Sequence, residues 1–134
     1  MTNDRRTLVF LTRPDDTAVR MAGSCALAAA AMGHRVDVFL LGEAVRAVVE
    51  GAGERGGAGA RGGGGGGERA GEPDDAAAAL FQARSAGTCR IFACSQGLVE
   101  SGLDPGAAQE ILDAVVGWPT ILEWTRGVAD RFFF

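Results

Sequence analysis

The chain has 134 residues and a formal net charge of −4, and all 13 of its basic residues are arginine. Without lysine it cannot build a Walker-A phosphate site or form a Schiff base, because both need a lysine amine. A single histidine excludes a multi-histidine metal site within one subunit, and an acidic chain without tyrosine argues against a nucleic-acid groove. We therefore expect no metal, no cofactor and no nucleic-acid partner.

The length predicts one domain that spans residues 1–134. No stretch of 18 apolar residues is present, and the polar residues 1–6 run into an apolar stretch without a cleavage site, so we expect neither a membrane span nor a signal peptide. Three cysteines, an odd number, favour free thiols over a disulfide framework. Together these features predict a cytoplasmic protein.

Strands and helices are predicted to alternate along the chain. Short apolar runs bounded by Gly, Pro or polar residues predict four strands, at residues 7–12, 36–41, 89–94 and 132–134. Apolar residues at helical spacing predict five helices, at residues 16–32, 43–50, 75–86, 105–115 and 120–130. Residues 95–102 are left as a polar segment with room for one helical turn.

Local signals mark where two of these helices begin. Asp15 or Asp16 would cap the first helix, and Gly33 would end it. Thr120 and Glu123 have the spacing of a capping box and would open the last helix. The apolar stripe of the first helix is predicted from residues at helical spacing: Ala18, Met21, Ala22, Cys25, Ala29 and Met32.

The alternation of strands and helices predicts an α/β fold with a mostly parallel sheet and helices on both faces. Residues 51–73 interrupt this pattern, since 12 of these 23 residues are glycine. Glycine loses the most entropy on ordering and offers no side chain to bury. We expect this segment to be a flexible surface insertion within the single domain.

Cys94 is the best candidate for chemistry. Sites in open parallel sheets form at the carboxyl ends of the strands, and Cys94 ends the third predicted strand. The backbone N–H groups of Ser95 and Gln96 could stabilise its thiolate, which is the nucleophilic form. Arg13 follows the first strand at the same edge and could hold an anion or assist a persulfide. A buried, inert Cys94 remains the alternative interpretation.

The other thiols and the histidine are predicted to be structural. Cys25 lies on the apolar stripe of the first helix, whereas His34 and Cys89 come at the starts of strands, at the opposite edge of the sheet. Cys89 and Cys94 are five residues apart on one strand and would point to opposite faces, with Cα atoms ~16 Å apart. That separation is beyond disulfide reach, so Cys94 has no partner in its own strand.

Three stretches together resemble proteins of the DsrE/DsrF-like family. Residues 28–39 run from an Ala-rich helix through Met-Gly into a Val/Phe strand. Residues 91–95, Ile-Phe-Ala-Cys-Ser, are followed by Gly102 and Leu103, which is similar to the family's cysteine segment. Residues 122–134 are similar to its terminal helix and aromatic strand. The resemblance covers most of the chain outside residues 51–73.

This resemblance implies a three-layer α/β sandwich, flavodoxin-like or DsrE-like, that assembles into homotrimers or hexamers. Exposed aromatic candidates, Trp118, Trp124 and Phe132, also favour a homo-oligomer. The resemblance further implies a persulfide on Cys94 and partners that donate and accept sulfur. Three functions stay open at this point: a sulfur carrier or sulfurtransferase-like protein, a non-catalytic oligomeric module that binds a small ligand or protein, and a redox-sensing thiol protein.

Overall fold

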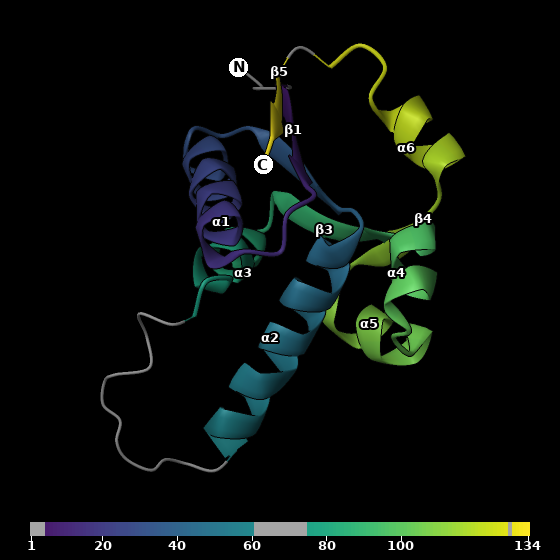
Figure 1. Cartoon of the computed structure of the whole chain (residues 1–134). Coiled ribbons are helices and arrows are strands. Elements are labelled where there is room, and N and C mark those ends of the chain that lie inside the picture. The colour runs from purple at the N-terminus through teal and green to yellow at the C-terminus, as the bar shows by residue number, and fades with distance from the viewer. Residues whose placement is uncertain (1–4, 61–74, 129) are drawn as a thin grey trace.

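The computed structural model describes residues 5–60, 75–128 and 130–134 (Figure 1). Within these residues, five strands form one sheet: β1 (Arg6–Leu11), β2 (Arg35–Leu40), β3 (Cys89–Cys94), β4 (Ala114–Val116) and β5 (Asp130–Phe133). The described helices are α1 (Asp16–Ala31), α2 (Glu43–Ala60), α3 (Ala78–Ser85), α4 (Ser95–Ser101), α5 (Pro105–Ile111) and α6 (Trp118–Trp124). The predicted α/β class is confirmed.

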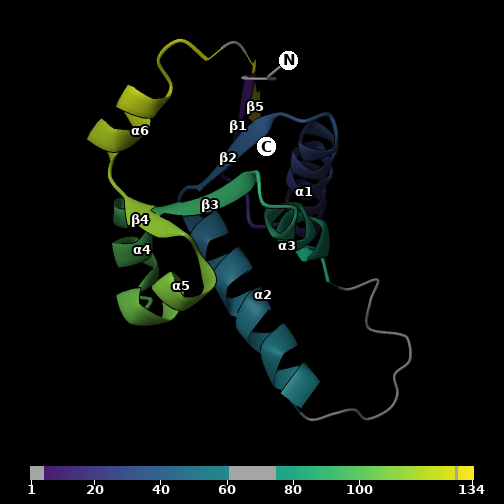
Figure 2. The ribbon, with the colours of Figure 1, turned by 180° about the vertical axis from the view of Figure 1, so that it is seen from behind.

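All described strand pairs are parallel, and the strand order is β4-β3-β2-β1-β5. The chain therefore moves in one direction across the sheet from β1 to β4 and then returns past β1 to place β5 at the far edge. Connections between parallel strands are right-handed. Since the connection from β4 to β5 runs in the opposite direction across the sheet, it lies on the other face from the earlier connections. Figures 1 and 2 show this connection, which carries α6, passing from β4 to β5.

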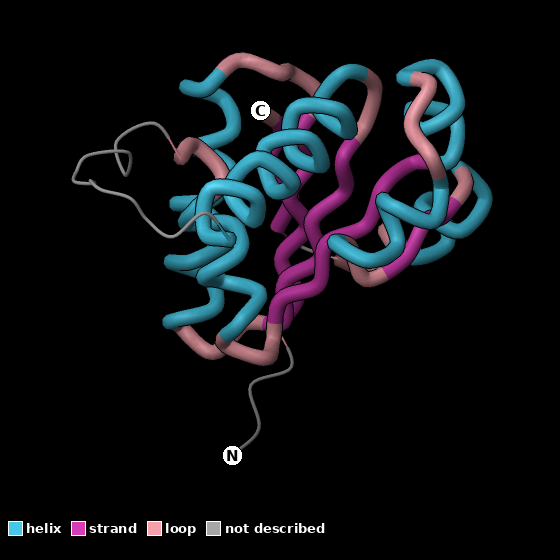
Figure 3. The backbone as a smooth tube through the Cα atoms, turned by 90° about the horizontal axis from the view of Figure 1, so that it is seen from below, coloured by secondary structure: helices cyan, strands magenta, loops and turns pink. Residues whose placement is uncertain are grey.

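The core is divided between the two faces of the sheet. On one face, alternate strand residues such as Val9, Val38 and Ile91 pack against buried side chains of α1, α2, α3, α4 and α5. On the other face, Phe10 and Phe39 share a smaller cluster with side chains from α6 and the segment that follows it. Figure 3 shows the strands lying between helices. Among the described helices, α6 alone covers the second face.

The apolar stripe of α1 differs from the predicted one. Met21 and Met32 are more than half exposed, whereas the buried side of the helix includes Val19, Gly23 and Ala26. Gly23 packs so closely on α3 that a Cβ there would lie 2.8 Å from the backbone nitrogen of Leu80. This contact selects a small residue rather than a large apolar one. The predicted stripe is confirmed at Ala18, Ala22 and Ala29, which are buried, and is wrong at Met21 and Met32. The predicted N-cap is confirmed, since the Asp15 carboxylate accepts a hydrogen bond from the Ala18 N–H at 3.0 Å.

The C-terminal third contains a strand that the sequence pattern did not predict. The helix expected over residues 105–115 ends at Ile111, and residues 114–116 form β4. Asp113 makes this change, because its N–H donates to the Ile91 carbonyl at 2.9 Å while its carboxylate accepts from the Ile91 N–H at 2.7 Å. These bonds pair the segment with β3, and tertiary pairing overrides the local helical periodicity.

Three other helix boundaries also differ from the predictions. Helix α6 begins at Trp118, with Pro119 in its first turn, so Thr120 lies inside the helix and does not cap it. Residues 95–101 form the complete helix α4 rather than a mostly open segment. Helix α2 continues to Ala60, past its predicted end at residue 50. The rest of the predicted glycine-rich insertion, residues 61–73, lies outside the described residues, and its role as an insertion stays a prediction.

Candidate functional site

Cys94 joins strand β3 to helix α4. It is the last residue of β3 and also the N-cap of α4, with extended backbone angles of φ −73° and ψ 129°. Since the sheet is parallel, its carboxyl edge gathers the ends of β1, β2 and β3, and Cys94 lies at this edge beside Val116 of β4. The thiol does not cap the helix through a side-chain hydrogen bond. Its backbone position is the one predicted from the sequence.

The structure places the Cys94 side chain in the interior rather than in an open loop. Cys94 is 3% exposed and belongs to the same cluster as Phe92 and Ile121 of α6. The sequence predicted a more open site, because residues 95–102 read as a polar segment. Instead α4 follows at once and β4 pairs alongside, with Cys94 opposite Val116. A reagent must therefore enter this cluster to reach the sulfur.

The predicted supporting residues are only partly assembled around Cys94. Ser95 and Gln96 follow it directly and are exposed on the first turn of α4, where the Gln96 amide donates to Glu100 at 3.1 Å. Arg13 is exposed in the loop after β1, and its Nε pairs with the Asp15 carboxylate at 3.0 Å. No hydrogen bond or ion pair within the described residues joins Arg13 to Cys94.

Cys89 and His34 lie at the starts of strands, as the sequence predicted, and Cys25 lies on α1, where it is only partly buried. Cys89 begins β3 and packs in the core cluster on the opposite face of the sheet from Cys94. Burial, together with the carboxylates of Asp113 and Asp37, raises the pKa of Cys89 to about 12. Burial also raises the pKa of Cys25. His34 is buried, with its Nδ1 2.9 Å from the Thr7 hydroxyl.

A charged cluster on the α6 face was missed by the sequence reasoning. Asp37 of β2 is 3% exposed, and its carboxylate pairs with Arg6 of β1 at 2.9 Å and with Arg90 of β3 at 3.1 Å. The Arg90 guanidinium carbon also lies 5.0 Å from the Phe92 ring centroid and 5.5 Å from the Trp124 ring. The sequence carried one signal for this cluster. Asp37 and Arg90 each lie two residues before a phenylalanine on the same strand, so the charged side chain and the aromatic ring share one face of the sheet.

Four phenylalanine rings cross this face side by side. Phe133, Phe10, Phe39 and Phe92 are register partners on β5, β1, β2 and β3, with centroid separations of 4.9, 5.3 and 5.6 Å. Trp124 of α6 packs edge-on against Phe92 at 5.0 Å. Aromatic pairs of this kind each contribute about 0.5–1.5 kcal/mol beyond their buried area. Phe10, Phe39 and Phe92 belong to the buried cluster that also contains Cys94, whereas Phe133 is 69% exposed.

The sequence was compared with models of known protein families. The model of the DsrE/DsrF-like family matches residues 5–133. The chain belongs to the DsrE/DsrF-like family. No curated protein matches it. The resemblance inferred from the helix-to-strand, cysteine and C-terminal segments is thereby confirmed, and the parallel sheet with its six described helices is consistent with a DsrE-like fold.

Membership of the DsrE/DsrF-like family associates the chain with sulfur relay. In the described part of this DsrE-like chain, no three His, Cys, Asp or Glu side chains are grouped so that they could hold a metal ion. None of the described helices is long and apolar enough to span a membrane.

Proposed function

We propose that this DsrE/DsrF-like chain is a sulfur carrier in which Cys94 holds a persulfide. The observation that carries the proposal is the position of Cys94 at the carboxyl end of a central parallel strand, where β3 passes into α4. Ligands and reactive groups of open α/β sheets gather at this edge. Family membership supports the same chemistry, because the family is associated with sulfur relay.

The proposed step transfers one sulfur atom without an external oxidant. The Cys94 thiolate attacks the outer sulfur of a donor persulfide, R–S–SH, so that a new S–S bond forms on Cys94 as the donor S–S bond breaks. The donor leaves as RS⁻ with the electron pair and takes up a proton to become RSH. Attack by an acceptor thiolate on the outer sulfur of Cys94–S–SH reverses these roles and regenerates the thiol.

Delivery of sulfur requires access to the buried Cys94. On the α6 face its cluster includes Ile121, and α6 is preceded by Gly117 and followed, after a short turn, by Gly127 at φ +73°. A small outward shift of this seven-residue helix would open the cluster. Cys25 and Cys89 are poorer candidates, because Cys25 lies on α1 and Cys89 begins β3, so neither is at the carboxyl end of a strand.

The burial of Cys94 also favours a second candidate function. A cysteine with 3% exposure is typical of an inert core residue, and the chain would then be a non-catalytic oligomeric module that binds a small ligand or a protein at this edge. Under either function we propose a homotrimer or homohexamer, and under the first also a sulfur-donating and a sulfur-accepting protein as partners.

Loading with glutathione persulfide separates the two functions. We expect the reduced protein to gain one sulfur atom, about 32 Da by intact mass, on the peptide that contains Cys94. Cys25→Ser and Cys89→Ala should load equally well, because neither thiol takes part. Cys94→Ser, which is nearly isosteric, should not load. Sulfur on Cys25 or Cys89 alone, or no adduct at all, would contradict the carrier function, and the second result favours the binding module.

A further inference from the structure

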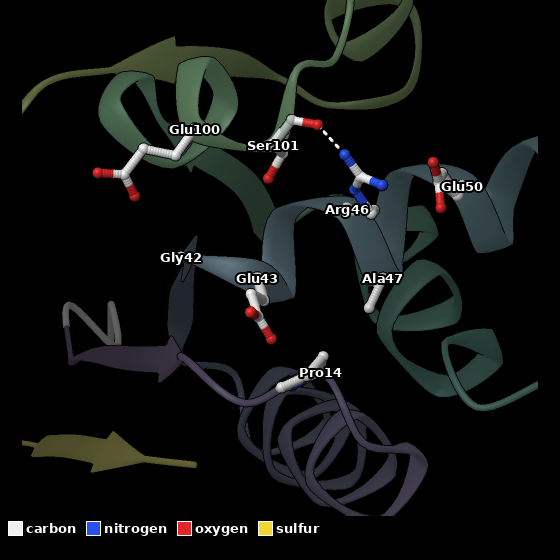
Figure 4. A pocket seen from close by; sticks show the side chains of 8 residues that line it. All are labelled: Pro14, Gly42, Glu43, Arg46, Ala47, Glu50, Glu100 and Ser101. Carbon is white, nitrogen blue, oxygen red and sulfur yellow. Dashed lines mark hydrogen bonds between the residues drawn. The ribbon is translucent and has the colours of Figure 1, made fainter.

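A cavity separate from Cys94 lies at the same edge of the sheet. It has a volume of about 490 Å³ and opens between the loop after β1, the first turns of α2 and the last turn of α4 (Figure 4). Its lining combines small apolar surfaces with charged side chains: Pro14, Gly42, Glu43, Arg46, Ala47, Glu50, Glu100 and Ser101. This volume lies within the usual range of small-molecule sites. Cys94 is the N-cap residue of α4, at the other end of this helix from Ser101.

The charge of the lining is negative. The lining includes three glutamates and one arginine, Arg46, which donates a hydrogen bond to the backbone carbonyl of Ser101. Glu100 accepts a hydrogen bond from Gln96. In the part of the chain that the structure describes, the Glu43 and Glu50 carboxylates have no hydrogen bond or ion pair. Both carboxylates are exposed and, among the described residues, have no competing partner.

Ser101 provides an independent sign of a ligand. The residue is 8% exposed, and its hydroxyl makes no hydrogen bond with any described residue. In Figure 4 this hydroxyl points into the cavity, whereas the carbonyl of the same residue points to Arg46. A buried hydroxyl without a partner costs free energy, and nearly all such groups in folded proteins are satisfied by protein, water or ligand.

We propose that this cavity binds an aliphatic polyamine. Glu43 and Glu50 lie seven residues apart on α2, which separates them by roughly 10 Å along the helix axis. An extended chain with an ammonium group at each end fits this separation, and its methylene groups suit the apolar walls at Pro14 and Ala47. Ammonium groups only donate hydrogen bonds, which matches the free carboxylates and the acceptor lone pairs of Ser101.

Spermidine titrated into the ¹⁵N-labelled protein tests the proposal. We expect saturable shifts of the backbone amides of Ala47, Glu100 and Ser101. Glu43→Gln or Glu50→Gln should weaken binding about five- to ten-fold, since each removes a charged acceptor, and Ser101→Ala about three-fold. Glu110→Gln is the matched control, because it removes the same charge from an exposed position on α5 and should change affinity less than about two-fold. Cys94→Ser should bind spermidine as the parent does.

Three results would overturn the polyamine site. The first is the absence of saturable shifts at these amides. The second is an equal loss of affinity in Glu110→Gln and Glu43→Gln, which would show general attraction to an acidic protein. The third is equal binding of succinate, which carries the opposite charge. None of these results bears on persulfide loading, so the two proposals stand or fall separately.

Discussion

Cys89 shows how the surroundings of a thiol decide its chemistry. Burial and the nearby carboxylates of Asp113 and Asp37 disfavour the thiolate and raise the pKa of Cys89 to about 12. In the unfolded chain the same thiol titrates near its ordinary value of about 8.5. Between about pH 8.5 and pH 12, the Cys89 thiol therefore stays protonated in the folded state while it ionises in the unfolded chain.

We predict that the stability contributed by the protonated Cys89 thiol is present below about pH 8.5 and is lost as pH rises toward 12. The slope is at most about 1.4 kcal/mol per pH unit for one group. The chain has no lysine and no tyrosine, so thiols are the main side chains that titrate in this window. Urea unfolding at pH 8 and pH 10.5 measures the effect, which should be clearly smaller in Cys89→Ala. An equal loss in both proteins would mean that Cys89 ionises normally in the fold.

Asp37 is the second residue whose environment allows a sharp prediction. Its carboxylate is the shared acceptor for Arg6 and Arg90, and its side chain is 5% exposed. Asp37→Asn should lower the free energy of unfolding by about 1.5–3 kcal/mol, because two charge-assisted hydrogen bonds lose their charged acceptor. The matched control is Asp130→Asn, whose ion pair with the exposed Arg5 should be worth less than about 1 kcal/mol. Similar losses in both variants would contradict the importance of the buried cluster.

The sequence predicted the positions of single residues along the chain better than their burial and their contacts. The backbone position of Cys94 follows from strand length and chain order, which the sequence carries directly. Its burial depends on β4 and α6, which are brought over it by tertiary pairing. The Arg6–Asp37–Arg90 cluster joins three strands that are far apart in sequence, and only the strand order makes them neighbours.

At the scale of elements, Gly97 fixes how closely α4 can approach the start of α2. A Cβ at Gly97 would lie 2.9 Å from the Gly42 nitrogen and 3.1 Å from Val45. Gly97→Ala should therefore cost about 1–3 kcal/mol of unfolding free energy. Gly51→Ala is the control, since a Cβ on this helical glycine meets nothing within 4 Å and should stabilise the fold by about 0.5–1 kcal/mol. Chemical denaturation measures both, and a neutral Gly97→Ala would refute the close approach.

Elements with strong local signals were predicted well, and those set by pairing were not. Strand β3 was predicted at its observed limits, because a buried apolar run is bounded by polar residues. Strand β4 was not predicted, because three residues carry little periodic signal and its partner, β3, lies about twenty residues earlier in the chain. For α6, the Pro119 signal in the first turn outweighs the capping-box spacing of Thr120 and Glu123.

At the scale of the whole molecule, the two faces of the sheet are unequally covered. On the face that α6 covers, three large apolar side chains remain exposed to solvent: Trp118, Leu122 and Phe133. Phe133 is 69% exposed although its ring stacks on Phe10. Apolar surface of this kind is typical of contacts between subunits.

We predict a homo-oligomer, with three or six copies of the 13.8 kDa chain. Light scattering on a micromolar sample should give a mass of three or six times this value. If the α6 face contributes to assembly, Leu122→Glu should shift the mass toward that of one chain, because it places a charge on the exposed apolar surface. Glu110→Gln, on α5, serves as the control and should leave the mass unchanged. A mass of one chain for the parent protein would contradict the prediction.

The release of sulfur from Cys94 is the decisive test of a sulfur carrier, because a carrier must pass on the sulfur that it accepts. The protein is loaded with ³⁴S-labelled persulfide, freed of donor, and mixed anaerobically with cysteine as the acceptor thiol. We expect about one labelled sulfur per subunit to leave Cys94 and to be trapped by alkylation as cysteine persulfide, and Cys94→Ser to yield none. Label that stays on the protein, or that never reaches Cys94, would contradict the carrier function.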